Sequence, residues 1–289
     1  MQAPPWLDEL DLRADGPPWL GMGLRRTDED GWLWPDAERP AELEERRRLL
    51  AERRDEVVHI GPGTEAAGAE VLALVRAWLA AHDLGAGPAG EPTAEPGEPA
   101  LVTAARLVQE DLCLMVPRTT ADGAVRHHLD AAVLCFPSHW RLSDKAGRPA
   151  DVVHGPVPGY RADLADRVDR YLERLRPGVI GVRRNWSVHD SPALFAPDPP
   201  ASSRGVEVDE VGTGLWLRSE RQTLRALDAG AVLFTIRVQQ VRFGALAARP
   251  DLAAALAARI DAQPAVLTAM NGLAPHVDAV QTWLRAVPV

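Results

Sequence analysis

Five strand-like segments lie between residues 107 and 241, and only one helix-like segment interrupts them. The first two flank a short polar turn, TTADG, and predict a hairpin; the last two are joined by a turn around residues 227–230. Strands and helices do not alternate regularly, so the order predicts an α+β fold, an antiparallel sheet covered by helices. The strand segments are residues 107–116, 124–137, 179–190, 214–224 and 230–241, and the helix is predicted over 164–175.

Helical patterns flank this strand-rich middle. Residues 42–58 predict a charged amphipathic helix, and residues 65–84 predict a second helix with a stronger apolar stripe. Residues 85–99 contain mostly Gly, Pro, Ala and Glu and predict an exposed connector. The last 48 residues are Ala/Leu-rich and are broken by three prolines, Pro250, Pro264 and Pro275. We expect one domain over 1–289, with an N-terminal region over 1–100, a core over 101–241 and C-terminal helices over 242–289.

Tryptophan is unusually frequent, with nine Trp against four Phe and two Tyr. Four of them, Trp6, Trp19, Trp32 and Trp34, fall within the proline-rich first 40 residues. This segment therefore predicts a coil that packs onto the domain through its aromatic rings. The tryptophans either fill a core that is poor in Phe or line a flat cavity.

Composition excludes several classes of function. A net charge of -9 repels phosphate backbones and disfavours nucleic-acid binding. Two cysteines are too few for a disulfide framework or a cysteine-based zinc site, which fits a reducing cytoplasm. The acidic start is unlike a secretory signal. The sequence contains no apolar run of about eighteen residues, so we expect no membrane span. The motifs of phosphate loops, dinucleotide folds, zinc proteases, serine hydrolases and covalent haem sites are also absent.

The most unusual stretch is VHGPVPGY, residues 153–160. Its two prolines fix φ and its two glycines allow close approach, so His154 is predicted to be held stiffly in a non-helical loop. Such a histidine suits a metal ligand or an oriented acid or base. The alternative is a histidine that caps a turn through its backbone-facing nitrogen.

Polar residues gather at three further places. On the strand 179–190, Arg183 and Asn185 share one face, and Arg184 and Trp186 share the other. The run RSERQT at 218–223 is costly to bury unless its members bond to each other or face a ligand. The acids of the run QED at 109–111 are either catalytic or engaged in a cap or an arginine pair. The adjacent residues His127 and His128 point to opposite faces of a strand and do not predict a shared metal.

These motifs resemble the haem-dependent oxidative N-demethylase family. The resemblance spans residues 19–240, with a weaker match at WLGMGLR (19–25). It depends most on HGPVPGY and ERQTL occurring in this order. The matching segments are LVQEDLCLM (107–115), LCFPSHWRLSDKAGRP (134–149), VVHGPVPGY (152–160), RRNWSVHD (183–190), RSERQTLRAL (218–227) and GAVLFTIR (230–237).

The resemblance implies a PAS-like antiparallel sheet that holds non-covalent haem b. It also implies oxidative N-demethylation of a small alkylamine, such as dimethylamine, with O₂ and with electrons from a separate reductase. The alternatives are a non-catalytic haem sensor or carrier, and a module whose Trp-rich pocket binds some other ligand.

The resemblance also implies roles for individual residues. His154 is the expected axial iron ligand. Glu220 is the expected acid near bound oxygen, with Glu110 as its rival. The expected cofactor contacts are Arg183, Arg184 and Arg221 for the haem propionates and Trp140 and Trp186 beside the macrocycle.

Two positions depart from the family pattern. His139 stands where arginine is expected, and Ser219 stands where valine is common. His139 therefore either removes a propionate contact or introduces a second imidazole near the iron.

Overall fold

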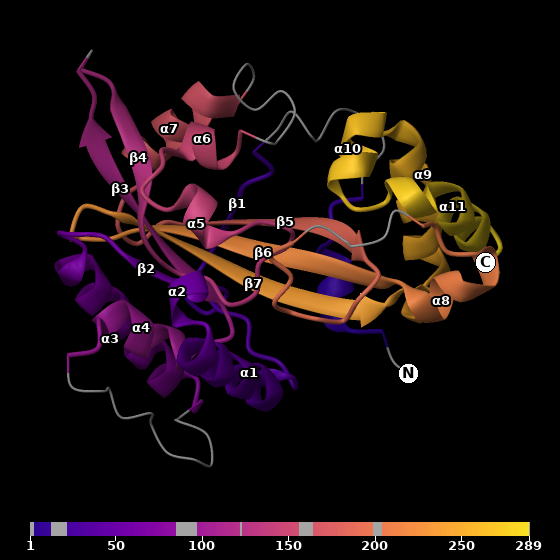
Figure 1. Ribbon diagram of the computed structural model, residues 1–289, viewed down its shortest axis with the longest axis horizontal. Helices are drawn as coiled ribbons and strands as arrows, with labels where there is room; N and C mark the ends of the chain where they lie inside the picture. Colours follow the sequence, from indigo (N-terminus) through magenta and orange to yellow (C-terminus); the bar gives the residue numbers. More distant parts are fainter. Residues whose placement is uncertain are drawn as a thin grey trace.

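A computed structural model describes residues 3–12, 22–84, 97–121, 123–155, 164–198 and 204–288. Its centre is one sheet of seven antiparallel strands in the order β1-β5-β6-β7-β3-β4-β2 (Figure 1). The predicted α+β class with an antiparallel sheet is confirmed. The strands are β1 (Arg25–Thr27), β2 (Val58–Ile60), β3 (Asp111–Thr119), β4 (Val125–Val133), β5 (Ile180–His189), β6 (Trp216–Ala226) and β7 (Val232–Arg242).

The long strands agree with the sequence patterns. β3 and β4 form the predicted hairpin, and β6 and β7 are paired over their whole length. Gly230 takes φ +84° in the turn between β6 and β7, where its N–H donates to the carbonyl of Leu227. β1 and β2 were not predicted, because three residues are too few to show a strand period. They pair with β5 and β4 and form the two edges of the sheet.

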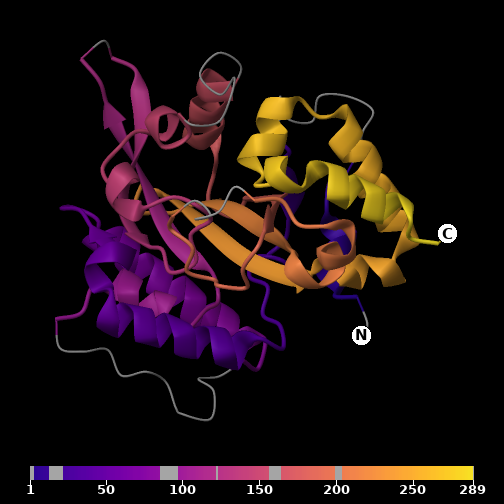
Figure 2. The same cartoon turned by 45° about the vertical axis from the view of Figure 1, so that its right-hand side comes forward.

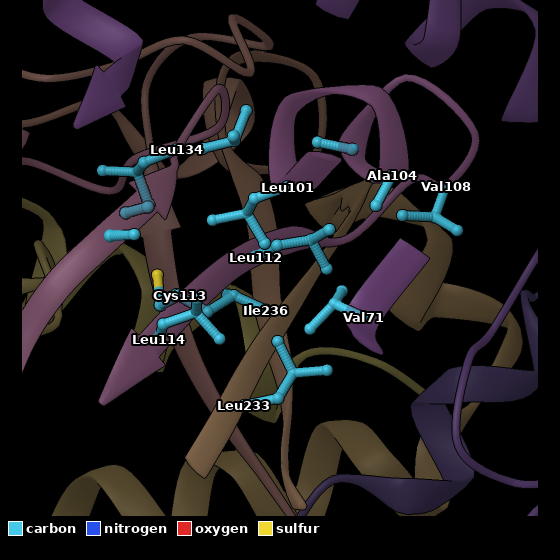
Figure 3. Close-up of a cluster of buried hydrophobic side chains, with 14 of the residues drawn as sticks. Val71, Leu101, Ala104, Val108, Leu112, Cys113, Leu114, Leu134, Leu233 and Ile236 are labelled. Carbon is cyan, nitrogen blue, oxygen red and sulfur yellow. The ribbon is translucent and has the colours of Figure 1, made fainter. Parts of the chain in front are cut away.

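The helices α1 (Arg39–Glu52), α3 (Glu65–Ala81) and α4 (Ala100–Ala105) lie together on one side of the sheet (Figures 1 and 2). Buried leucines of β3 and β7 meet apolar side chains of α3 and α4 there, as Figure 3 shows for Leu112, Leu233 and Val71. The helix predicted over 42–58 is divided at Arg53 into α1 and the short α2 (Arg54–Val57), and its last residue, Val58, begins β2.

The other side of the sheet carries the short helices α5 (Leu142–Lys145) and α6 (Ala150–Val153) and the longer α7 (Ala165–Arg174). α7 is the helix predicted over 164–175. Gly155 follows His154 directly, whereas both prolines and the second glycine of the motif lie in 156–163, outside the described residues.

The C-terminal helices form a second apolar cluster at one end of the sheet. They are α8 (Val211–Gly214), α9 (Pro250–Ala262), α10 (Ala265–Met270) and α11 (Val277–Arg285), with 3-10 turns at Val208–Glu210, Phe243–Ala248 and Ala274–His276. A further 3-10 turn, Pro5–Glu9, lies in the N-terminal segment and packs its Trp6 and Leu7 into the same cluster. The predicted breaks hold, because Pro250 begins α9, Pro264 precedes α10 and Pro275 precedes α11.

The N-terminal segment packs through its aromatic rings, as predicted. Trp6 is buried in the C-terminal cluster, Trp32 is fully buried in the main core, and Trp34 is partly buried. Trp19 lies outside the described residues. The excess of tryptophan therefore serves packing at these three positions.

The end of α10 is docked on the part of β5 that the short edge strand β1 leaves uncovered. The N–H of Val188 donates to the carbonyl of Asn271 over 2.8 Å, and Gly272 follows with φ +70°. A Cβ at Gly272 would lie 2.4 Å from the carbonyl oxygen of Val188. Only glycine therefore fits this contact.

We expect Gly272→Ala to destabilise the protein more than Gly230→Ala. Both variants force a left-handed residue, which costs about 1 kcal/mol. At Gly230 no atom lies within 4 Å of the added Cβ, whereas Gly272→Ala also forces α10 from β5 and costs about 1–3 kcal/mol more. Urea unfolding of the two variants measures the difference, and equal losses would contradict the docking contact.

Candidate functional site

A cavity of about 980 Å³ opens on the sheet face that carries α6 and α7. It is bounded by β3, β5, β6 and β7, by α6 and α7, by the N-terminal residues 8–12 and 22–25, and by the corner between α9 and α10. Most of the wall is apolar. The large apolar side chains are Leu10, Leu12, Met22, Leu24, Met115, Leu164, Val168, Leu172, Leu224, Phe234, Val266, Leu267 and Met270.

Polar side chains of two paired strands form part of the wall. The register places Arg183 opposite Gln222 and Asn185 opposite Glu220. The amide groups of Asn185 and Gln222 both donate to Glu220 Oε2, over 3.1 and 2.9 Å. Arg183, Asn185 and Gln222 line the cavity, whereas Glu220 lies beside its two amide partners and outside the lining.

His154 lines the cavity from the end of α6. It caps this short helix rather than standing in a wholly non-helical loop, and its Nδ1 lies 2.8 Å from the carbonyl oxygen of Ala150. A carbonyl only accepts, so Nδ1 carries the proton and the lone pair of the neutral ring is on Nε2. This is the turn cap considered above, and the same contact fixes the tautomer and direction that a metal ligand needs.

Charge and burial keep this imidazole neutral. Burial lowers the pKa of His154 to about 4, the contact with Ala150 opposes the shift, and the positive charges of Lys145 and Arg183 add to it. A neutral imidazole is the form that binds iron. The ring is therefore ready to ligate at neutral pH without losing a proton.

Lys145 and Trp140 form a pair outside the cavity lining. The Lys145 ammonium lies 4.0 Å from the centre of the Trp140 ring. Burial lowers the pKa of Lys145, and the negative charge of Glu220 is the largest opposing influence. Trp140 therefore contacts an ammonium group in this structure.

Three arginines form a ladder on the other face of the sheet. Arg184 of β5 is paired with Arg221 of β6, which is paired with Arg237 of β7. Like charges directly opposite each other repel, so such a ladder needs negative partners. Arg237 finds them in Asp36 and Glu42, over 2.7 and 2.9 Å.

Glu9 of the N-terminal segment compensates the rest of the ladder. Its carboxylate lies 3.1 Å from Arg184, 3.5 Å from Arg221 and 3.1 Å from Arg25. Burial lowers the pKa of Arg184 to about 10, Glu9 opposes the shift, and Arg221 and Arg237 add to it. Glu9 thus stabilises the charged form of these arginines.

One member of the ladder and one residue near it on the same strand also border the cavity. Arg184 and Trp186 line it along the part of β5 that β1 leaves uncovered, because β1 pairs only with Ile180–Val182. Arg221 does not line the cavity and binds the carbonyls of Gly31 and Trp32. Of the candidates, His154, Arg183, Arg184 and Trp186 therefore meet at the cavity, and Arg221, Trp140 and Glu220 lie outside its lining.

The rival residues lie elsewhere. Glu110 is buried, and its Oε1 accepts the N–H of Trp34 over 2.8 Å. The neighbouring acid, Asp111, lies 3.0 Å from Arg46, which is the arginine pair considered above. His139 has φ 58° and stacks on His189 at 4.4 Å, away from the cavity lining.

The polar run at 218–223 is satisfied mainly by internal bonds. Arg218 donates to the carbonyls of Phe136 and Leu194, among others, and Ser219 donates to the carbonyl of Asn185. Only Gln222 of this run lines the cavity. The cost of burying these groups is therefore met within the protein.

Sequence reasoning missed three residues of this region. Glu9 and Tyr171 carried no sequence signal, because Glu9 pairs with Arg184, and Tyr171 lines the cavity, only through residues that are distant in the chain. Lys145 stands in the segment 134–149 that carries the family resemblance, which was the available signal.

The described residues contain no cluster of three or more His, Cys, Asp and Glu side chains that could hold a metal ion. One oriented imidazole suits haem, since the porphyrin supplies four ligands and the protein needs to supply one. None of the helices in the described ranges has the length and apolar character needed to cross a bilayer.

Comparison with protein families identifies the family of this chain. The model of the family "haem-dependent oxidative N-demethylase, alpha subunit-like" matches residues 87–280. The chain belongs to this family. No curated protein matches it significantly. The predicted resemblance is confirmed, and with it haem dependence and an oxidoreductase of the N-demethylase type.

The matched region differs from the predicted one at both ends. It begins after the weak N-terminal match at 19–25, and it includes most of the C-terminal helices, for which the sequence showed only helical character. In this N-demethylase family member, α9 and α10 border the cavity, so their inclusion agrees with the geometry.

We expect Glu9→Gln to lower the free energy of unfolding by about 3 kcal/mol, since it leaves buried guanidinium groups without their carboxylate. Asp8→Asn is the matched control, because Asp8 pairs with the partly exposed Arg249 over 2.8 Å. The control should lose about 1 kcal/mol or less. Denaturant titration of both variants measures the losses, and equal values would show that the ladder does not depend on Glu9.

Proposed function

We propose that this chain is the haem b-binding oxygenase subunit of an amine N-demethylating monooxygenase. The observation that carries the proposal is His154, a neutral imidazole directed by Ala150 at the wall of a large, mostly apolar cavity. Family membership supports the haem and the reaction class.

The cavity fits a porphyrin in size and chemistry. Its volume of about 980 Å³ is at the upper end of the range for pockets that enclose a large organic ligand. Apolar side chains such as Val168, Leu172 and Phe234 suit a flat hydrophobic ring, and Arg183 supplies positive charge for its carboxylates. His154 would be the axial ligand, with its proton held at Nδ1 by Ala150.

The remaining cofactor contacts follow from their positions. Arg184 and Trp186 would meet the haem where the cavity reaches the edge of β5. Arg221 would act indirectly, since it shares Glu9 with Arg184. Trp140 would support the site indirectly, because the ammonium group of Lys145 lies over its ring.

When bound, haem would supply the oxygen chemistry of the demethylation. Glu220 would hold a proton for that chemistry at Oε1, because Asn185 and Gln222 both bind Oε2. The substrate would be a small alkylamine. The electrons would come from a separate reductase, since no motif for a flavin or an iron–sulfur cluster occurs in the sequence. We place this subunit in the cytoplasm, because its two cysteines are buried and free.

Replacement of the axial ligand tests the haem site. We expect the purified protein to show a Soret band, and His154→Ala to abolish or shift it, because the iron loses its protein ligand. His139→Ala is the matched control and should keep the band, since His139 stacks on His189 away from the cavity lining. A Soret band that is unchanged in His154→Ala would overturn the assignment.

Turnover tests the role of the acid. With dithionite, O₂ and dimethylamine, we expect the loaded protein to form formaldehyde and Glu220→Gln to reduce kcat at least about a hundredfold. Glu110→Gln should keep the activity, because the side chain of Glu110 accepts the backbone N–H of Trp34 on the other side of the sheet. Full haem loading without turnover on any small alkylamine would favour the sensor or carrier function instead.

A further inference from the structure

A phenol hydroxyl borders the cavity and has no assigned role. Tyr171 of α7 lines the cavity beside Leu172 and Val168. Among the described residues, none forms a hydrogen bond with its hydroxyl. Burial raises the pKa of Tyr171, so the phenol keeps its proton at neutral pH and remains a donor.

The sheet is shaped to receive this ring. A Cβ at Gly181 of β5 would lie 2.2 Å from the Tyr171 hydroxyl oxygen and 3.4 Å from Leu24 Cδ2. The hydroxyl therefore occupies the place of the missing side chain on the cavity face of β5. A glycine in a strand interior weakens the strand, and a close approach of this kind is a reason for it.

Arg183 is the next residue on the same face of that strand. Alternate residues of a strand point to the same side and lie roughly 6.6 Å apart along it. The Tyr171 hydroxyl at position 181 and the Arg183 guanidinium are thus two neighbouring hydrogen-bond donors on one wall of the cavity. A carboxylate accepts hydrogen bonds at both oxygens and carries the charge that complements arginine.

We propose that Tyr171 and Arg183 together bind a carboxylate of the molecule that fills the cavity. The inference rests on the proposed function, in which that carboxylate is a haem propionate. It assigns Tyr171 as a binding residue of this chain and explains the glycine at position 181. It also puts the propionate contact on the cavity face of β5, whereas Arg184 and Arg221 of the ladder contact Glu9 on the other face.

Haem binding with and without carboxylates tests the proposal. We expect Tyr171→Phe to weaken the binding of haemin about tenfold, the effect of one hydrogen bond to a charged group. The same variant should bind the dimethyl ester of haemin as tightly as the wild type, because the ester has no carboxylate. Ser143→Ala, which removes an exposed hydroxyl on α5, is the control and should bind both compounds like the wild type.

A double variant separates a joint site from two independent contacts. If both donors hold one carboxylate, the loss in Tyr171→Phe combined with Arg183→Met should be smaller than the product of the single losses. Absorbance titration of the Soret band measures all the affinities. Equal weakening for haemin and its ester, or no weakening by Tyr171→Phe, would overturn the proposal. A wild type that binds neither compound would instead overturn the proposed function.

Discussion

The fold of this chain depends on compensating the positive charge of a buried arginine ladder. Arg184, Arg221 and Arg237 stand directly opposite one another on three neighbouring strands, where like charges repel. The sheet tolerates them because carboxylates from the N-terminal region, including Glu9 and Asp36, contact them. Removing one partner of a buried pair costs about 3–5 kcal/mol, so the N-terminal region is integral to the fold.

The two faces of the sheet are covered differently. One face is covered by the N-terminal segment and by α1, α3 and α4, with their apolar and ionic contacts. The other face keeps room for a cavity between α6, α7 and the α9–α10 corner. The N-terminal residues 8–12 reach round the open edge of β5 and complete the wall. The ladder and the cavity therefore depend on the same segment.

His154 in the cavity wall and Glu220 beside that wall are both held by fixed partners. Ala150 directs the imidazole of His154, and the amides of Asn185 and Gln222 hold one oxygen of Glu220. Each of these bonds is local or lies across one strand pair. Preorganisation of this kind reduces the ordering cost when a cofactor binds. Membership of the haem-dependent oxidative N-demethylase family makes haem the cofactor expected of this chain.

The sequence by itself determined the long strands, the α+β class, the breaks at Pro250, Pro264 and Pro275, and the family resemblance. These features depend on short-range periodicity, on proline geometry and on motifs that persist in one stretch of chain. Only the tertiary structure decided that Arg184 and Arg221 contact Glu9. It also decided that Glu110 accepts the N–H of Trp34 and that the Tyr171 hydroxyl packs against Gly181. These pairs join residues that are distant in the chain, and their contacts exist only once strand register and helix packing bring them together.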